Sequence, residues 1–479
     1  MRRGDPSVWQ FVNPLIGWGD FRIMYHYVSR KNAIHFRHPS NMPEPSLPPL
    51  LIVADSPEAL TDLCGISLLE RMRRIVVHLG FREAMILSNS VKATAADVAK
   101  QSWHRADMSL TFRERKGAKV TVGEIVDSLA AMKVRSGGRI LIVFASFYCD
   151  GRLLCSLAQA RINSALIDSD PPSIIAPFLE SSDARGRLFC ATVLSSEWFS
   201  GKNRAAALEQ EIELDVMAGR IAAIDAAKQQ AYLSDMRRSV RPVFFPAPSL
   251  ECRPLAERLL RDATQSGVLD FPALVHAPIE KWIVSHLCRT TITPNQITLG
   301  TGVLGLGVTL LYAYGYLWAG ALLALLVGIL DGVDGKLARL KVQKTKTGKK
   351  EHLLDYFVEM SWWGALAHHF HTTGQVRYAY VIWLAFFASD SVERVAKWFV
   401  KRRVGRSIDD VSRFDRLVRR VAGRRNIYTW LFTLCLLIRA PATGFVLLCL
   451  WGMATAAVHI FRAVQIRCAF PNKIVPPMS

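Results

Sequence analysis

The chain has 479 residues, 51% of them hydrophobic, and its 60 Lys and Arg against 40 Asp and Glu give a formal net charge of +20. This length allows two or three domains. The apolar residues gather from Ile297 onward into runs separated by basic segments, as in multi-pass membrane proteins with Lys- and Arg-rich cytoplasmic loops. Such loops account for the charge, so we expect no nucleic-acid partner. The nine cysteines have no C-x-x-C spacing, which favours reduced thiols over disulfides or a zinc site.

The front of the chain predicts a soluble α/β domain. Residues 1–48 form an extension without a continuous apolar run, so we expect no cleavable signal peptide, and they end in the proline-rich linker "HPSNMPEPSLPPL". Over 49–247, short β-like runs alternate with helical patterns, which predicts a mostly parallel sheet. The expected strands are "LLIVA", "EAMILSN", "ILIVFASFY" and "SALIDSD", and "ISLLERMRRIVVHLG" is an expected helix that ends at its glycine.

Residues 248–296 are an expected linker that contains a helix, a turn and a second, amphipathic helix. The second helix carries Ile279, Trp282, Ile283 and Leu287. An amphipathic helix directly before a first membrane span is expected to lie along the membrane surface. The alternative is a soluble helix between two domains.

Six apolar runs between 297 and 465 predict an all-α bundle of six transmembrane helices, followed by a tail at 466–479. The runs lie near 297–314, 317–334, 353–373, 378–400, 427–438 and 445–461. The fifth is short against the roughly 20 residues that a membrane helix needs. Seven Lys or Arg between Lys336 and Lys350, and more between Lys401 and Arg425, assign these loops to the cytoplasm. We expect a multi-pass protein of the cell membrane with both termini and the α/β domain in the cytoplasm.

Acidic residues appear where the second apolar run ends, in "DGVDGKLAR". Asp331 and Asp334 stand at i and i+3 and share a helix face. Carboxylates near hydrocarbon are costly unless they are paired or hold a cation, and oxygen ligands of this kind suit Mg²⁺, Mn²⁺ or Ca²⁺. We expect Gly332 and Gly335 to leave the backbone of this turn open to a ligand, and Arg339 to offer a planar fork for phosphate.

A second acid pair stands at the start of the third apolar run. Asp355 and Glu359 are one helical turn apart, and in a helix bundled beside the second they would converge on Asp331 and Asp334. This predicts a carboxylate cluster for one or two divalent ions, at the boundary between membrane and water. The implied reaction is phosphoryl-group transfer between a water-soluble and a lipid-like reactant.

These residues resemble the signature of the CDP-alcohol phosphatidyltransferase family, D-x-x-D-G-x-x-A-R followed after eight or nine residues by G-x-x-x-D-x-x-x-D. The first half is matched in full by Asp331, Asp334, Gly335, Ala338 and Arg339. Gly348 then follows after eight intervening residues. The stretch "TPNQITL" before the first span is similar to the family's entry into its bundle, and six spans fit the family's fold.

The second half of the signature departs from the family pattern. His352 and Tyr356 stand where the family has aspartates. Two registers restore an acid pair: Asp355 with Glu359, which needs three extra loop residues, or Glu351 with Asp355. We favour the first, because loop insertions cost little and "LLDYFVE" keeps the apolar spacing of a span.

The resemblance implies a chemistry and a set of residues. Members bind a CDP-linked donor, CDP-diacylglycerol or a CDP-alcohol, at the signature turn; the expected donor-binding residues are Gly335, Ala338, Arg339 and Gly348. Two ions of Mg²⁺ or Mn²⁺ are expected on Asp331, Asp334, Asp355 and Glu359. An acceptor hydroxyl attacks the β-phosphorus and CMP leaves, with the proton taken by the last acid, so Glu359 and Asp355 are the expected catalytic residues. The implied role is phospholipid biosynthesis, with a homodimer as an expected assembly.

The α/β domain resembles the nucleotidyltransferases of sugar phosphates, through "ISLLERMRRIVVHLGFREAMILSN" and "ILIVFASFYCDGRLL". The family's phosphate loop is missing, because "VADSPEALTDLCG" lacks its glycines, and Ser146 stands in place of a metal-binding aspartate, with Asp150 displaced. We therefore expect a degenerate domain that docks or regulates. One alternative is a bifunctional enzyme whose front domain makes the CDP-alcohol from CTP, with Asp168 and Asp170 as metal ligands. Another is a non-catalytic membrane scaffold or lipid-binding protein derived from the transferase family.

Two further groups have alternative interpretations. His368, His369 and His371 near the end of the third span are expected to pack at the interface, with metal binding as the alternative. Arg424 and Arg425 are expected as cytoplasmic charge beside the fifth span, with a substrate phosphate as the alternative.

Overall fold

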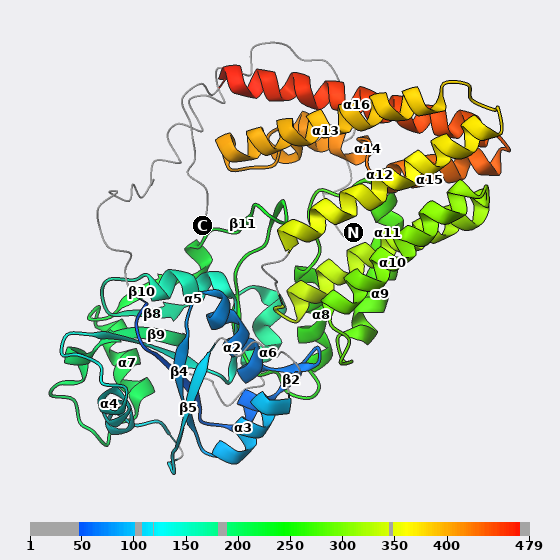
Figure 1. Ribbon diagram of the computed structural model, residues 1–479. Coiled ribbons are helices and arrows are strands. Elements are labelled where there is room, and N and C mark those ends of the chain that lie inside the picture. Colours follow the sequence, from blue (N-terminus) through cyan, green and yellow to red (C-terminus); the bar gives the residue numbers. More distant parts are fainter. Residues whose placement is uncertain (1–46, 101–107, 118, 181–188, 344–347, 470–479) are drawn as a thin grey trace, which may run out of the picture. The chain divides into compact units, whose positions relative to one another are not determined.

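The computed structural model describes residues 47–100, 108–117, 119–180, 189–343 and 348–469 (Figure 1). For Glu180, residues 348–354 and Ala469, it describes the backbone alone. Nearly all of the expected N-terminal extension and most of the expected tail lie outside these ranges.

The α/β part is built on a seven-stranded sheet with the strand order β10-β8-β9-β6-β1-β4-β5. Its strands are β1 (Leu50–Ala54), β4 (Glu83–Ser88), β5 (Ser109–Glu114), β6 (Arg139–Phe144), β8 (Ser164–Ile167), β9 (Phe189–Ser195) and β10 (Ala222–Asp225). β9 pairs antiparallel with β6 and β8, and the other neighbours in the sheet run parallel. The prediction of a mostly parallel α/β domain is confirmed.

Helices cover the sheet and share its apolar core. The longer ones are α2 (Leu68–His78), α3 (Val91–Lys100), α4 (Val122–Ala131), α5 (Gly151–Ala158) and α7 (Leu208–Met217). The sequence predicted that α2 begins at Ile66, but Ile66–Ser67 form a short strand, β3, which pairs with β2 (Asp62–Leu63). The helix then starts at Leu68 because the Ser67 hydroxyl caps it by accepting the backbone N–H of Glu70.

The linker contains the two expected helices, α8 (Arg253–Ala263) and α9 (Phe271–Leu287). In α9, His276, Glu280 and Val284 recur every four residues and are buried, whereas the Trp282 side chain is 65% exposed. Ile283 and Leu287 were predicted on the apolar face with Trp282, but they pack inward against a buried cluster. Trp282 and Ile279 are the two predicted apolar residues that remain exposed.

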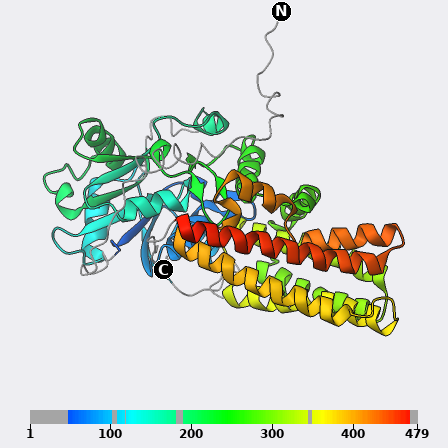
Figure 2. The ribbon, with the colours of Figure 1, turned by 90° about the horizontal axis from the view of Figure 1, so that it is seen from above.

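The C-terminal part is helical. Its long helices are α10 (Pro294–Ala313), α11 (Leu317–Leu340), α12 (Gly348–Thr372), α13 (Ala379–Val404), α15 (Arg425–Leu437) and α16 (Pro441–Ala469). In both ribbon views α13 lies alongside α16 (Figures 1 and 2). A buried aromatic core joins the helices and includes Trp362, Trp363, Phe370, Phe386 and Phe432.

Three of these helices are long and apolar enough to cross a membrane: Pro294–Ala313, Leu317–Leu340 and Pro441–Cys468. α15 has 13 residues. At a rise of about 1.5 Å per residue it spans only about 20 Å, which agrees with the short fifth run in the sequence. It follows α14 (Arg413–Val421), and a short 3₁₀ helix, η5 (Ile408–Asp410), lies between α13 and α14.

A third apolar cluster joins the α/β part to the helices. Leu63 and Leu68 pack in it with Val284 of α9 and with Val333 and Leu337 of α11. α11 is thus in contact with the α/β part along the same turns that carry the acidic signature.

Candidate active site

The signature residues lie on one continuous helix. The second apolar run was expected to end near Asp334, but α11 continues to Leu340, so all of "DGVDGKLAR" is helical. The helix positions Asp331 and Asp334 one turn apart, and both line a pocket of about 1300 Å³. Gly335, Ala338 and Arg339 line the same pocket. The five residues of the first half of the signature therefore face one cavity.

The second acid pair reaches this cavity from α12. Asp355 and Glu359 both line the large pocket, and Asp355 also lines a small adjoining pocket together with Asp331 and Asp334. The acids of the favoured register are therefore gathered around one space. The side chain of Glu351, the acid of the other register, lies outside the described residues, and at Gly348 only the start of α12 is described.

Each of three acids has a polar partner. The Thr298 hydroxyl donates to Asp334 Oδ2 at 2.8 Å, the Arg425 guanidinium lies 2.5 Å from Asp331 Oδ2, and Arg394 lies 3.8 Å from Glu359. Arg425 thus contacts an acid of the signature, a role that the sequence did not predict. Thr298 was also missed, although it lies within "TPNQITL", the stretch that resembles the family's entry.

The chemistry of this donor set fits a divalent metal ion. Carboxylate oxygens are the preferred ligands of Mg²⁺ and Mn²⁺, and the positive charges of Arg425 and Arg394 already lie beside two of these acids. Within the described residues, however, the acids are not close enough to make a group of three or more ligands for one ion.

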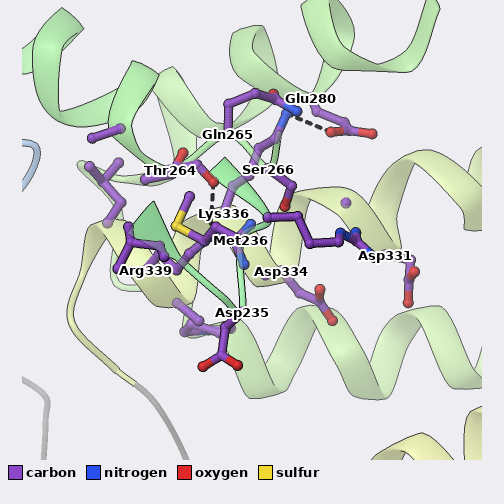
Figure 3. A pocket seen from close by; sticks show the side chains of 18 of the residues that line it. Asp235, Met236, Thr264, Gln265, Ser266, Glu280, Asp331, Asp334, Lys336 and Arg339 are labelled. Carbon is purple, nitrogen blue, oxygen red and sulfur yellow. Dashed lines mark hydrogen bonds and ion pairs between the residues drawn. The ribbon is translucent and has the colours of Figure 1, made fainter. Parts of the chain in front are cut away.

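Arg339 is held by the linker. Its Nε donates to the backbone carbonyl of Thr264 at 2.9 Å, and Arg339 and Thr264 lie on the same side of the pocket (Figure 3). Gly335 lies beside the guanidinium, because a Cβ at this position would be 3.5 Å from Nη1. The Thr264 carbonyl fixes one edge of the planar guanidinium group, and Arg339 lines the pocket.

Gly332 also allows a close contact with the linker. A Cβ there would lie 2.4 Å from the carboxyl carbon of Glu280, a buried residue of α9. The same carboxylate pairs with the Lys336 ammonium at 2.6 Å (Figure 3). Gly332 lines the pocket, as expected of an open backbone, but the Glu280 side chain from the linker occupies the space that a side chain at this position would take.

In the α/β part, the acids that were considered as metal ligands pair with arginine side chains. Asp168 and Asp170 lie 2.5 and 3.7 Å from Arg241, and Asp150 caps α5 and pairs with Arg152. Ser146 follows β6 and is buried. These acids are thus engaged in ion pairs with arginine.

The remaining candidate residues make local contacts. His368 contacts the Tyr380 hydroxyl at 2.9 Å, His371 contacts the carbonyl of Arg377 at 3.2 Å, and the His369 ring lies against Gly315. Arg424 donates to Asp409 of η5 at 2.7 Å. Of the two arginines, Arg425 alone reaches the acidic cluster among the contacts described.

Residues 291–410 match the model of the family described as CDP-alcohol phosphatidyltransferase. Two curated relatives are both named bifunctional IPC transferase and DIPP synthase. The protein from Thermococcus kodakarensis is 30% identical over 161 residues (33% of this chain and 36% of the relative), and that from Aquifex aeolicus is 38% identical over 78 residues (16% and 18%). The chain thus spans about a third or less of the length of these relatives.

Two solved structures are similar to this chain at low sequence identity. A Mycobacterium tuberculosis phosphatidylinositol phosphate synthase with CDP-DAG bound is 19% identical, with a TM-score of 0.31, covering 43% of this chain and 100% of the other. The UDP-glucose pyrophosphorylase from Acinetobacter baumanii is 8% identical, with a TM-score of 0.31, covering 44% and 92%. The match to the CDP-alcohol phosphatidyltransferase family model covers residues 291–410, and the signature around Asp331 lies within this segment.

Proposed function

We propose that the protein is a membrane CDP-alcohol phosphotransferase, which moves a substituted phosphate from a CDP-linked donor to an acceptor hydroxyl and releases CMP. One observation carries the proposal. The complete first half of the signature lies inside the matched segment and lines one pocket together with Asp355 and Glu359. A scaffold protein would have no need for four carboxylates and an arginine around a common cavity.

The acids, the arginine and the small residues of this pocket have distinct roles in the proposal. Asp331, Asp334, Asp355 and Glu359 are the residues that would hold Mg²⁺ or Mn²⁺, which when bound neutralises the charge of the donor's phosphates. Arg339, oriented by the carbonyl of Thr264, binds a donor phosphate through its remaining N–H groups. Gly335 and Ala338 keep this wall of the pocket small enough for the donor to approach the helix.

The proposed reaction is an in-line displacement. The Glu359 carboxylate accepts the proton of the acceptor hydroxyl, whose oxygen forms a bond to the β-phosphorus of the donor. The bond between that phosphorus and the oxygen bridging to CMP breaks, and CMP leaves with the electron pair. Asp355, one turn before Glu359, orients the reacting groups.

The membrane arrangement is part of the proposal. Besides the three helices that are long and apolar enough to span a membrane, we place α12, α13 and α15 across the bilayer, because they share one aromatic core with α10, α11 and α16. The basic segments after α11 and α13 then face the cytoplasm, with both termini and the domain at 49–247 on the same side.

The names of the two curated relatives give a reason to test a second activity in the front domain, the synthesis of the CDP-alcohol from CTP. The pairing of Asp168 and Asp170 with Arg241 supports a degenerate domain instead. Supplying CTP and alcohol phosphates and measuring pyrophosphate decides between the two. Sustained pyrophosphate production, abolished by Asp168→Asn, would establish the second activity.

CMP release tests the main proposal. The purified full-length protein in lipid nanodiscs is given Mg²⁺ and a panel of CDP-linked donors, both lipid and water-soluble, with a panel of alcohols. We expect release with at least one pair and its loss in Asp334→Asn. The matched control is Glu251→Gln, at an exposed position that does not line the pocket, and it keeps full activity. No release with any pair would reject the proposal.

A further inference from the structure

The pocket at the signature has a second wall that lies outside the family segment. Two stretches of chain, both before residue 291, line the cavity together with residues of α11 and α12: the hairpin at 232–239 and the segment at 264–270. We call these two stretches the roof. Figure 3 shows Asp235, Met236, Gln265 and Ser266 of the roof around the same space as Asp334. A protein that consisted of the family domain alone would lack this wall.

The hairpin of the roof is fixed at its base. Its strands, β11 (Tyr232–Leu233) and β12 (Arg238–Ser239), pair antiparallel. The Tyr232 hydroxyl is hydrogen-bonded to the Asp410 carboxylate, and the Arg237 guanidinium lies 3.4 Å from the buried Asp409 carboxylate. Both aspartates belong to η5, so the hairpin is anchored to the family domain beyond the fourth long helix.

The hairpin is also connected to the signature arginine. The backbone N–H of Gly267 donates to the carbonyl of Met236 at 2.8 Å, and Arg238 donates to the carbonyls of Asp262 and Gln265. Gly267 is required for this contact, because a Cβ would lie 2.2 Å from the carbonyl oxygen of Arg237. The same segment presents the Thr264 carbonyl to Arg339. The roof and the donor-binding turn are thus one connected polar structure.

The roof offers hydrogen-bonding groups to the cavity. Ser234, Asp235, Gln265 and Ser266 line it, and the Asp235 side chain is 78% exposed. Gln265 Oε1 is buried and has no hydrogen-bond partner among the described residues. A buried acceptor without a donor is costly, and a hydroxyl group of a ligand would satisfy it. Leu233, Met236, Val268 and Leu269 of the roof also line the cavity. The polar part of this lining suits a hydroxyl-bearing, water-soluble group.

We propose that the roof recognises the hydroxyl-bearing, water-soluble reactant of the transfer, with Asp235 and Gln265 as specificity-determining residues. The inference rests on the proposed function and gives the front domain a part in it: the hairpin of this domain and the linker together supply a wall of the transferase pocket. Asp235 accepts hydrogen bonds from the reactant's hydroxyl groups, and Gln265 holds the reactant against the signature turn.

Steady-state kinetics of CMP release tests this role. With the donor and acceptor pair that is active in the wild type, each reactant is varied against a saturating amount of the other. For Asp235→Ala combined with Gln265→Ala we expect the KM of the water-soluble reactant to rise about tenfold or more, because two hydrogen bonds to this reactant are lost. We expect kcat and the KM of the other reactant to stay within about twofold. Glu251→Ala is the matched control and leaves all three constants unchanged.

A second measurement does not depend on turnover. Met236→Cys is labelled with N-ethylmaleimide in the full-length protein, with and without CDP and Mg²⁺, and the labelling rate is followed peptide by peptide. We expect CDP to slow labelling at position 236 several-fold, because both share the cavity, and to leave a Glu251→Cys control unaffected.

The outcomes separate the two proposals. Without CMP release from the wild type, the proposed function fails and this inference fails with it. With release from the wild type but an unchanged KM in the double variant, the function stands and the recognition role of the roof is rejected. A fall in kcat together with an equal rise in both KM values would likewise reject it, because the roof would then have only a structural role. Unchanged labelling at position 236 in the presence of CDP would show that the roof does not line the cavity that CDP occupies.

Discussion

The Glu280 carboxylate of α9 lies 2.6 Å from the Lys336 ammonium of α11, and both residues are buried. Lys336 follows Asp331 by five residues, which is about 140° around the helix. The linker helix α9 therefore contacts the signature helix α11 on a side away from Asp331. Gly332 makes this possible, because it leaves space for the carboxylate beside the helix backbone.

Breaking this ion pair should destabilise the fold. Lys336→Met leaves a buried carboxylate without its cation, and we expect the free energy of unfolding to fall by about 3–5 kcal/mol. Unfolding of the detergent-solubilised protein by heat or denaturant measures the loss. Glu280→Gln together with Lys336→Met should recover most of it, since no buried charge remains. A Lys336→Met variant as stable as the wild type would contradict the importance of the pair.

Gly332→Ala should be harmful where a comparable change in α10 is not. The added methyl group would overlap the Glu280 carboxylate, so this side chain must move away from Lys336 or α9 must shift away from α11. Gly300→Ala is the matched control, because no atom lies within 4 Å of a Cβ at that position. We expect a lower melting temperature for Gly332→Ala only, in the same unfolding assay. Equal melting temperatures for both variants would show that α9 is not tightly packed there.

The α/β part caps the end of the signature helix. Arg71 and Arg74 of α2 are buried, and their Nη1 atoms donate at 2.7 Å to the carbonyls of Leu340 and Lys341, the last residue and C-cap of α11. Cations at a helix C-terminus bond its free carbonyls and stabilise its dipole.

Loss of this cap should loosen the end of α11. For Arg74→Met we expect faster backbone hydrogen exchange over 338–342 and a loss of about 1.5–3 kcal/mol in the free energy of unfolding. Arg73→Met serves as the control, because both arginines pair with Glu70 of their own helix but Arg74 also donates to the carbonyl of Lys341. Hydrogen exchange over 338–342 that is the same in both variants would refute the capping role.

The register of the second acid pair predicts different effects of two substitutions. Glu359 lines the pocket, so Glu359→Gln should reduce CMP release by at least about 100-fold, in the range that general-base catalysis contributes. Glu351→Gln should retain activity within about threefold. If Glu351→Gln alone abolished release, the alternative pair of Glu351 with Asp355 would be correct.

Metal affinity should respond to the charges around Asp331 in opposite directions. Asp334→Asn removes a carboxylate ligand and should weaken Mn²⁺ binding at least about tenfold, because ligand charge dominates the affinity of oxygen sites. Arg425→Gln removes the cation that pairs with Asp331 and should strengthen Mn²⁺ binding several-fold. Mn²⁺ titration followed by electron paramagnetic resonance measures both. Equal affinities in the three proteins would place the metal elsewhere.

Local patterns in the sequence were sufficient for the elements and for the core of the site. Short β-like apolar runs predicted β1, β4, β6 and β8, and longer apolar runs predicted the long helices of the C-terminal part. The spacing of Asp331 and Asp334 placed them on one face, because helix geometry fixes which residues share a face. The ends of elements were less predictable. α11 continues to Leu340 because an arginine of α2, more than 250 residues away in the chain, donates a hydrogen bond to the carbonyl of its last residue.

The residues that surround the signature were decided by tertiary structure. Glu280, Thr264, Thr298 and Arg425 carry no motif that links them to α11, and their contacts join segments 36 to 94 residues apart in the chain. By itself, the sequence determined that acids and an arginine recur at helical spacing beside a membrane, because that is a local periodicity. Only the packing of α9, α10, α15 and the roof decided which charges neutralise these acids, which glycine is filled, and which wall faces the substrate. Such pairings depend on distances between distant segments, which no local pattern encodes.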